Sequence, residues 1–255
     1  MRMITFSILR HFKYNNLAYN ITRRLKSDAV EVKSDDLKTT EVLPSWPEGE
    51  AIMRINATSS MRIYPNFVSE EEEASLLAEV EPQLKRLRYE YDHWDNAIEG
   101  YRETERDSWN NQNAAILKRV RDTAFQPNAQ LLPRAHILDL AAAGYIKPHI
   151  DAVRFCGNTI AGLCLLSSAV MRLVHESRPE FQLDALLERR CLYVMRDVSR
   201  YEFTHAVLGG EHSMWRGEKL PRRRRIAVIC RETHRLLITF FFTTPGRSRG
   251  TTASR

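Results

Sequence analysis

The amino-acid sequence predicts an α+β domain in which supporting helices precede a β-sandwich or barrel core. The length of 255 residues suits one compact domain with tails. Apolar residues recur at helical spacing before residue 125, and short apolar runs bounded by turn residues follow from about Arg134. These runs, which predict strands, are residues 136–140, 160–166, 170–174, 191–195 and 225–230.

Two helices are predicted in the first half of the domain. Ser69 and Glu72 have the spacing of a capping box, in which each side chain satisfies an exposed backbone N–H of the first turn. The apolar face of the helix that follows comprises Ala74, Leu76, Leu77 and Val80. A second helix is expected over residues 109–124, and residues 101–133 as a whole are interpreted as this helix plus loops.

The domain boundaries follow from changes in composition. We expect a folded domain over residues 61–232, preceded by a linker over 28–60, where the periodicity is weak and Pro44 and Pro47 occur. Residues 233–255 are predicted to be a flexible tail. This tail contains an apolar, β-prone run at 236–242 to which we assign no function.

The first 27 residues contain six basic side chains and no acidic one, and their apolar residues fit one face of a short helix. This pattern is typical of a mitochondrial transit peptide, which predicts a location in the mitochondrial matrix. A basic leader without a targeting role is the alternative. No apolar run approaches the roughly 20 residues that a membrane-spanning helix needs.

Charge and cysteine content exclude several classes. Residues 28–215 contain 21 basic and 30 acidic side chains, whereas a nucleic-acid-binding protein usually has a broad basic surface. The basic excess lies at the two ends of the chain. The four cysteines form no C-x-x-C pair, which argues against structural zinc, and their density favours a reducing compartment over a disulfide-stabilised secreted domain.

His149 and Asp151 form the most informative motif. Residues two apart in extended backbone point to the same side, so one imidazole and one carboxylate can converge on a cation. With a second histidine they would make the two-His, one-carboxylate triad of non-haem Fe(II) oxygenases. The candidates downstream are His175, His205, His212 and His234. We favour His205 because several strands fit into the intervening chain and its segment partly alternates polar and apolar residues.

Arg225 and Arg231 lie six residues apart in a predicted strand, so both side chains, with Ala227 and Ile229, belong to one face. Two guanidinium groups inside a barrel are costly without an anion, and a dicarboxylate co-substrate would satisfy them. The alternative is that the run 222–225 is only a solvated basic patch. Together with the triad, the arginines predict an Fe(II)-, 2-oxoglutarate- and O2-dependent dioxygenase.

Over residues 60–232 the sequence resembles the AlkB family of Fe(II)/2-oxoglutarate dioxygenases, in particular a mitochondrial branch of it. The segments that carry the resemblance are 89–95, 144–151, 155–157, 159–163, 170–175 and 225–231. The resemblance implies a double-stranded β-helix (jelly-roll) core, iron ligands at His149, Asp151 and His205, and 2-oxoglutarate contacts from Arg225, Arg231 and Tyr193. It also implies a link to fatty-acid and energy metabolism and to programmed necrosis after alkylation damage.

Two departures from the nucleic-acid-repairing members bear on the substrate. Those members place an Asn and a Tyr before the H-x-D motif, where this chain has Leu138 and Leu140, and they carry a basic, aromatic lid that is not evident here. We therefore expect a protein substrate and no repair of double-stranded DNA. Demethylation of mitochondrial RNA, such as tRNA, is the second hypothesis, and a non-catalytic interaction scaffold is the third.

Overall fold

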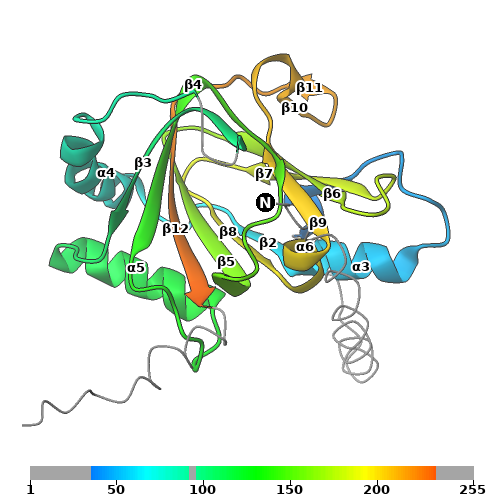
Figure 1. The fold of residues 1–255 in the computed structure, drawn as a ribbon, viewed down its shortest axis with the longest axis horizontal. Helices are drawn as coiled ribbons and strands as arrows, with labels where there is room; N and C mark the ends of the chain where they lie inside the picture. The colour runs from blue at the N-terminus through cyan, green and yellow to red at the C-terminus, as the bar shows by residue number, and fades with distance from the viewer. Residues whose placement is uncertain (1–35, 92–95, 234–255) are drawn as a thin grey trace, which may run out of the picture. The chain divides into compact units, whose positions relative to one another are not determined.

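The computed structural model describes residues 36–91 and 96–233, which fold around one ten-stranded antiparallel sheet (Figure 1). The strands follow the order β1-β7-β6-β9-β4-β12-β5-β8-β2, with β3 paired to β4. The bounds are β1 (Thr40–Val42), β2 (Met61–Tyr64), β3 (Ile98–Arg106), β4 (Ala135–His149), β5 (Cys156–Leu165), β6 (Ala169–His175), β7 (Gln182–Leu187), β8 (Leu192–Arg196), β9 (Phe203–Val207) and β12 (Arg225–Thr233). A separate hairpin comprises β10 (Met214–Trp215) and β11 (Glu218–Lys219).

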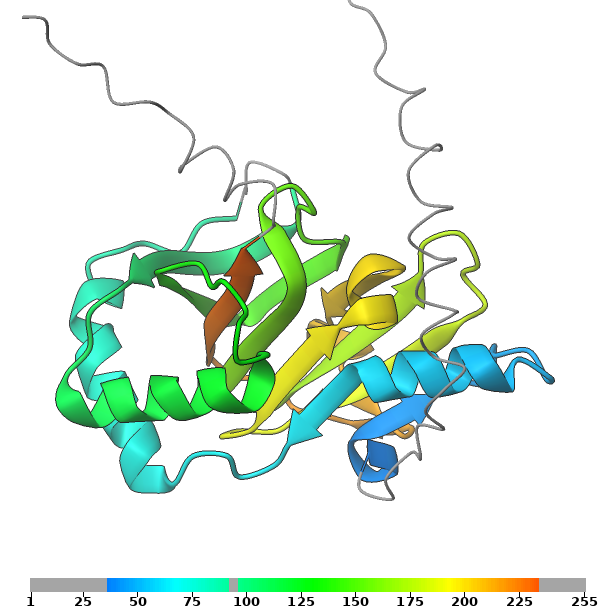
Figure 2. The same ribbon diagram turned by 90° about the horizontal axis from the view of Figure 1, so that it is seen from below.

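The sheet folds over, so that the strands on either side of β4 form two facing layers (Figures 1 and 2). One apolar cluster fills the space between the layers, with Ile160 and Ala227 from one side and Leu173 and Leu183 from the other. The alternation of β-strands explains this packing, because Ala227 and Ile229 of β12 join that cluster while Ile226 and Val228 join a second one. The same alternation places Arg225 and Arg231 on the inner face, as the sequence predicts.

Two helices cover the outer face of β5 and β12 (Figure 2). The helix α4 (Glu70–Leu84) begins with the predicted capping box: Ser69 Oγ accepts from the Glu72 amide, and Glu72 accepts from the Ser69 amide. The helix α5 (Asn111–Ala124) begins two residues later than predicted, because the Asn110 side chain caps it. Both helices contribute to the second apolar cluster, with Leu76 and Val80 from α4 and Ile116 and Val120 from α5.

The linker prediction for residues 28–60 is wrong over its described part. Helix α2 (Asp36–Thr39) leads into β1, which pairs with β7, and helix α3 (Ala51–Ser60) precedes β2. Ser199 of helix α6 (Asp197–Tyr201) donates to the Ala57 carbonyl of α3. The sequence pattern is weak here because β1 is three residues long and α3 buries mainly small residues. The predicted transit peptide, the linker residues 28–35 and the tail residues 234–255 lie outside the described residues.

Residues 98–106 form strand β3, so the interpretation of 101–133 as one helix plus loops is also wrong at its start. The strand is rich in charged side chains, which conceals it from a hydrophobicity pattern. Arg102 instead binds Asp139 of β4 at 2.7 Å, and Glu103 binds His136 of β4 at 2.8 Å. A cross-strand ion pair and a cross-strand hydrogen bond thus hold this edge strand where apolar alternation is missing. No helix in the described ranges is long and apolar enough to cross a membrane.

Candidate metal and co-substrate site

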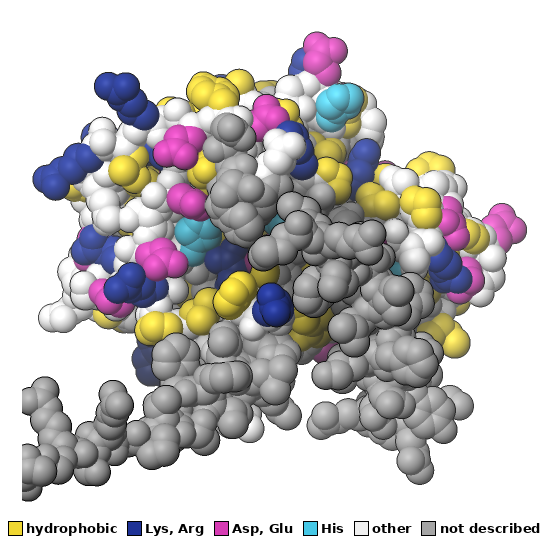
Figure 3. Space-filling view, viewed as in Figure 1, with side chains coloured by type: hydrophobic (Ala, Val, Ile, Leu, Met, Phe, Trp, Pro, Cys, Tyr) yellow, Lys and Arg dark blue, Asp and Glu magenta, His cyan; other side chains and the backbone are white. Residues whose placement is uncertain are grey.

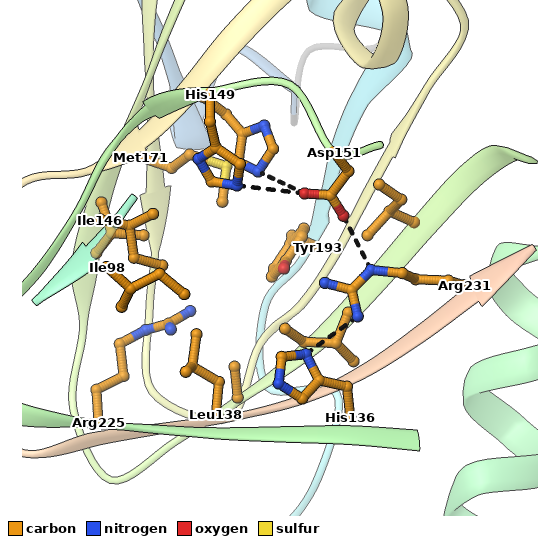
Figure 4. A pocket seen from close by; sticks show the side chains of 15 residues that line it. Ile98, His136, Leu138, Ile146, His149, Asp151, Met171, Tyr193, Arg225 and Arg231 are labelled. Carbon is orange, nitrogen blue, oxygen red and sulfur yellow. Dashed lines mark hydrogen bonds and ion pairs between the residues drawn. The ribbon is translucent and has the colours of Figure 1, made fainter. Parts of the chain in front are cut away.

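His149, Asp151 and His205 converge at one end of the space between the two layers (Figure 4). His149 is the last residue of β4, Asp151 follows two residues later, and His205 lies on β9 directly opposite His149 in the sheet register. Asp151 Oδ1 lies 3.3 Å from His149 Nε2 and 3.6 Å from His205 Nε2. The three candidate ligand atoms lie within 4.8 Å of one another, which suits a single metal ion.

The surroundings of the three residues orient the side chains and shift the pKa values of two of them. The ring of His149 is held by a hydrogen bond from Nδ1 to the Lys147 carbonyl at 2.9 Å, with Nε2 toward Asp151. Burial, with the nearby His149, lowers the pKa of His205 to about 3, so His205 is neutral near pH 7. Burial alone would raise the pKa of Asp151, but the Arg231 guanidinium holds it well below its ordinary value.

Arg231 links the triad to a hydrogen-bonded chain that crosses three strands. Its Nε donates to Asp151 Oδ2 at 2.9 Å, and its Nη1 donates to His136 Nδ1 at 3.1 Å. Because Nδ1 of His136 accepts, Nε2 carries the proton and donates to Glu103 at 2.8 Å. His136 is not among the site residues predicted from the sequence. Its even spacing from Leu138 and Leu140 in the same predicted strand was the available signal.

Arg225 lies at the opposite end of the cavity and is only 2% exposed. Its Nη2 donates to Cys164 Sγ at 3.0 Å, and its buried Nε has no hydrogen-bond partner in the part of the chain that the structure describes. No hydrogen bond or ion pair joins Arg225 to a carboxylate among residues 36–91 and 96–233. A buried guanidinium that lacks a carboxylate partner is positioned to bind an anionic ligand in the cavity.

The cavity between Arg225 and the triad is lined by both polar and apolar side chains, and Tyr193 lies in the middle (Figure 4). Leu138 lines the wall, and Leu140 is the register partner of Arg225 in the core, so neither offers a hydrogen bond. The apolar lining is Ile98, Leu138, Ile146, Ile160, Met171, Val207, Ala227 and Ile229. The two imidazoles and one carboxylate of the triad suit Fe(II). A dicarboxylate suits a cavity that is lined by two arginines, Arg225 and Arg231.

The other candidate histidines have different surroundings. His175 is buried, its Nδ1 accepts from the backbone amides of Ser177 and Arg178 at 3.2 Å, and its ring packs edge-on against Phe203. His212 is exposed in a short 3-10 helix at Gly210–His212, and His234 lies outside the described residues. The structure therefore brings only His205 of the three described candidates to the H-x-D motif.

The basic run at residues 222–225 is largely engaged within the protein. Arg224 binds buried Asp139 at 2.8 Å and Glu81 at 2.6 Å, and Arg222 donates to the Gly144 carbonyl. Arg225 lines the cavity, which leaves Arg223 as the exposed member. The interpretation of the whole run as a solvated patch is thus wrong, because Asp139 and Glu81 pair with Arg224 and the Gly144 carbonyl accepts from Arg222.

Two curated relatives match the chain over the same length. A Mus musculus protein named alpha-ketoglutarate-dependent dioxygenase alkB homolog 7, mitochondrial, is 54% identical over 169 residues, which are 66% of this chain and 76% of the relative. The Bos taurus protein of the same name is 53% identical over the same shares. Alpha-ketoglutarate is another name for 2-oxoglutarate. No family model matches the chain.

A solved prolyl hydroxylase from Trichoplax adhaerens, in complex with a hypoxia inducible factor oxygen degradation domain peptide fragment, is similar in fold. The TM-score is 0.51 at 11% identity, covering 84% of this chain and 98% of the hydroxylase. At that identity the likeness concerns the fold alone. It confirms the predicted jelly-roll architecture within an α+β domain.

Proposed function

Because this chain belongs to the AlkB family of alpha-ketoglutarate-dependent dioxygenases, we propose that His149, Asp151 and His205 bind Fe(II). We further propose that Arg225, Arg231 and Tyr193 bind 2-oxoglutarate in the adjoining cavity. The observation that carries the proposal is the buried guanidinium of Arg225, which shares one cavity with the triad and has no carboxylate partner among the described residues.

When bound, iron and 2-oxoglutarate supply oxidative decarboxylation and an O2-derived oxidant that attacks a C–H bond. The chain itself supplies position and charge. Arg231 keeps Asp151 ionised and oriented, and the Lys147 carbonyl fixes the ring of His149. Arg225 receives one carboxylate of the co-substrate at the far end of the cavity, and Tyr193 offers its hydroxyl midway. The apolar wall limits the water that reaches the site.

The direct test compares two arginines of the same basic run. Arg225→Met should raise the 2-oxoglutarate concentration needed for half-maximal succinate formation by at least tenfold, because a charged hydrogen-bonding partner is lost. Arg223→Met removes the exposed charge and is the matched control. If both variants turned over 2-oxoglutarate like the wild type, the assignment of Arg225 would be wrong. A wild-type protein that binds Fe(II) but forms no succinate would favour the scaffold hypothesis.

We propose that the substrate is a protein side chain, which is hydroxylated. Acidic residues outnumber basic ones over 28–215, and Arg224 in the run at 222–225 is paired with Glu81 and Asp139. On the part of the molecular face that Figure 3 shows in colour, Lys and Arg side chains are interspersed with Asp and Glu. Extended phosphate backbones bind instead to continuous basic surfaces. RNA demethylation is therefore an outcome of the test below rather than the leading proposal.

A trapping experiment separates the two substrate classes. The wild-type protein is loaded with Mn(II) and N-oxalylglycine, cross-linked in a mitochondrial extract and purified under denaturing conditions. We expect proteins whose capture is lost in the His205→Ala variant and is insensitive to ribonuclease. Capture of RNA by the wild type, with loss in the same variant, would overturn the protein proposal.

We propose a mitochondrial location, and specifically the matrix. Both relatives are named mitochondrial, and residues 1–27 contain six basic and no acidic side chains. A reporter fused to residues 1–27 should enter the matrix, and the same fusion with Arg2, Arg10 and Lys13 changed to Gln should remain outside. A diffuse cytosolic signal from the unchanged fusion would contradict the proposal. The link to energy metabolism and programmed necrosis stays a prediction from the resemblance.

A further inference from the structure

The environment of Arg225 raises the question of what balances its charge before co-substrate binds. The side chain is almost fully buried on the inner face of β12, and it donates a hydrogen bond to a sulfur atom, Cys164 Sγ, at 3.0 Å. A guanidinium group remains protonated in proteins, so burial of Arg225 without a counter-charge is unfavourable. Of the two groups in this contact, only the Cys164 thiol can become an anion, and the adjacent cation favours that change.

Cys164 is placed to fill that role. It is fully buried on β5, and the sheet register continues to Cys191, whose carbonyl accepts from the Cys164 amide at 2.9 Å. Burial alone would raise the pKa of Cys164, but a hydrogen bond from the Cys191 thiol and the charge of Arg225 together lower it to about 7. Cys191 itself keeps its proton, since its pKa is raised well above the ordinary value by its contact with Cys164 and by burial.

We propose that Cys164 is the internal counter-ion of Arg225: its thiolate balances the guanidinium in the ligand-free protein, and it takes up a proton from solvent when a dicarboxylate binds Arg225. The proposal rests on the proposed function, because it takes Arg225 as the site of the co-substrate carboxylate. The only covalent change is S–H bond formation, with the sulfur lone pair accepting one proton from water or buffer. Bound carboxylate replaces thiolate as the negative partner, so the net charge beside Arg225 is preserved.

The sign of the pH dependence follows from this exchange. Above pH 7 the ligand-free protein carries the Cys164 thiolate, and binding must protonate it; affinity for the dicarboxylate therefore falls as pH rises, approaching about tenfold per unit. Below pH 7 the thiol is already protonated and this dependence disappears. The groups that face Cys164 are Arg225 of β12, Tyr193 of β8 and Cys191, which directly precedes β8, while Glu188 acts on Cys191.

Calorimetry tests the proton uptake directly. N-oxalylglycine is titrated into the Mn(II)-loaded protein in two buffers that differ in ionisation enthalpy. At pH 8 the wild type should take up close to one proton per ligand, and at pH 6 the uptake at this site should be small. Cys164→Ser should lose the uptake gained between pH 6 and pH 8. Cys230→Ser is the matched control, because Cys230 lies on β12 in the other apolar cluster and burial raises its pKa.

A second measurement keeps the inference testable in the wild type alone. Thiolate absorbs in the ultraviolet, so the ligand-free protein should gain absorbance through neutral pH and lose it when N-oxalylglycine binds. Absence of a neutral-pH thiolate, or uptake that is unchanged in a folded Cys164→Ser variant, would overturn the counter-ion role while binding persists. If N-oxalylglycine does not bind the wild type at all, the proposed function fails, and the ligand-linked inference with it.

Discussion

Gly162 of β5 and Tyr193 of β8 lie directly opposite each other in the sheet, on the face that forms the cavity. A Cβ atom at position 162 would lie 2.2 Å from Cε1 of Tyr193, far closer than two carbon atoms can approach. The absence of a side chain at Gly162 therefore provides the space that the Tyr193 ring occupies. Position 162 in this way controls the placement of a residue that is proposed to contact 2-oxoglutarate.

Gly162→Ala should displace the Tyr193 ring and weaken binding of N-oxalylglycine. Overpacking of this kind typically costs about 1–3 kcal/mol of folding free energy. Denaturant unfolding and binding calorimetry measure the two effects. Tyr193→Leu removes the ring, so adding Gly162→Ala to that background should cost less than it does in the wild type. If Gly162→Ala cost the same folding free energy in both backgrounds, the cost would not arise from a clash with the Tyr193 ring.

His205→Ala should abolish 2-oxoglutarate turnover and reduce the affinity for Mn(II) by at least tenfold, because a triad reduced to two ligands loses geometry and affinity. Equilibrium dialysis with Mn(II) and a succinate assay give the two readouts. His212→Ala is the control, since that histidine is exposed and lies outside the cavity lining. Unchanged metal binding in His205→Ala would move the third ligand to another residue.

His136→Ala should loosen Arg231 without removing a proposed metal ligand. The substitution removes the hydrogen bond from Arg231 Nη1 to His136 Nδ1 at 3.1 Å. Arg231, which orients Asp151, is then held less firmly. Loss of an outer contact typically costs about 10–100-fold in metal affinity or activity. His136→Gln keeps an acceptor for Arg231 and a donor for Glu103, so it should recover part of the Mn(II) affinity. Equal Mn(II) affinities of His136→Ala and His136→Gln would show that the hydrogen bonds of His136 do not position Arg231.

Ser69→Ala should destabilise the domain by about 1 kcal/mol, because the N-terminal amides of α4 lose their capping oxygen. Ser69→Asp retains an acceptor and should lose much less. The free energy of unfolding by urea compares the variants, and 2-oxoglutarate turnover of the folded protein should be the same in all three. If Ser69→Asp lost as much unfolding free energy as Ser69→Ala, the capping hydrogen bond would contribute little to stability.

Local sequence pattern was sufficient wherever neighbours in the chain decide the structure. The capping box at Ser69 forms within one helical turn, and strict alternation in β12 is enough to put Arg225 and Arg231 on one face. His149 and Asp151 are likewise close because they are two residues apart at the end of a strand. The choice of His205 needed the resemblance and the spacing of the chain as well, since no local rule distinguishes it from His175.

Strand β3 and the segment from Thr40 to Ser60 were missed because their stabilising partners lie far away in the sequence. Arg102 depends on Asp139, and β1 depends on β7, contacts that no local periodicity reveals. The same is true of His136 beside Arg231 and of Cys164 beside Arg225. Hydrophobic periodicity and spacing therefore predicted the class of site and placed Arg225 and Arg231 on one face of a strand. The register between distant strands decided which charges meet, because only folding brings a buried cation within 3.0 Å of its sulfur partner.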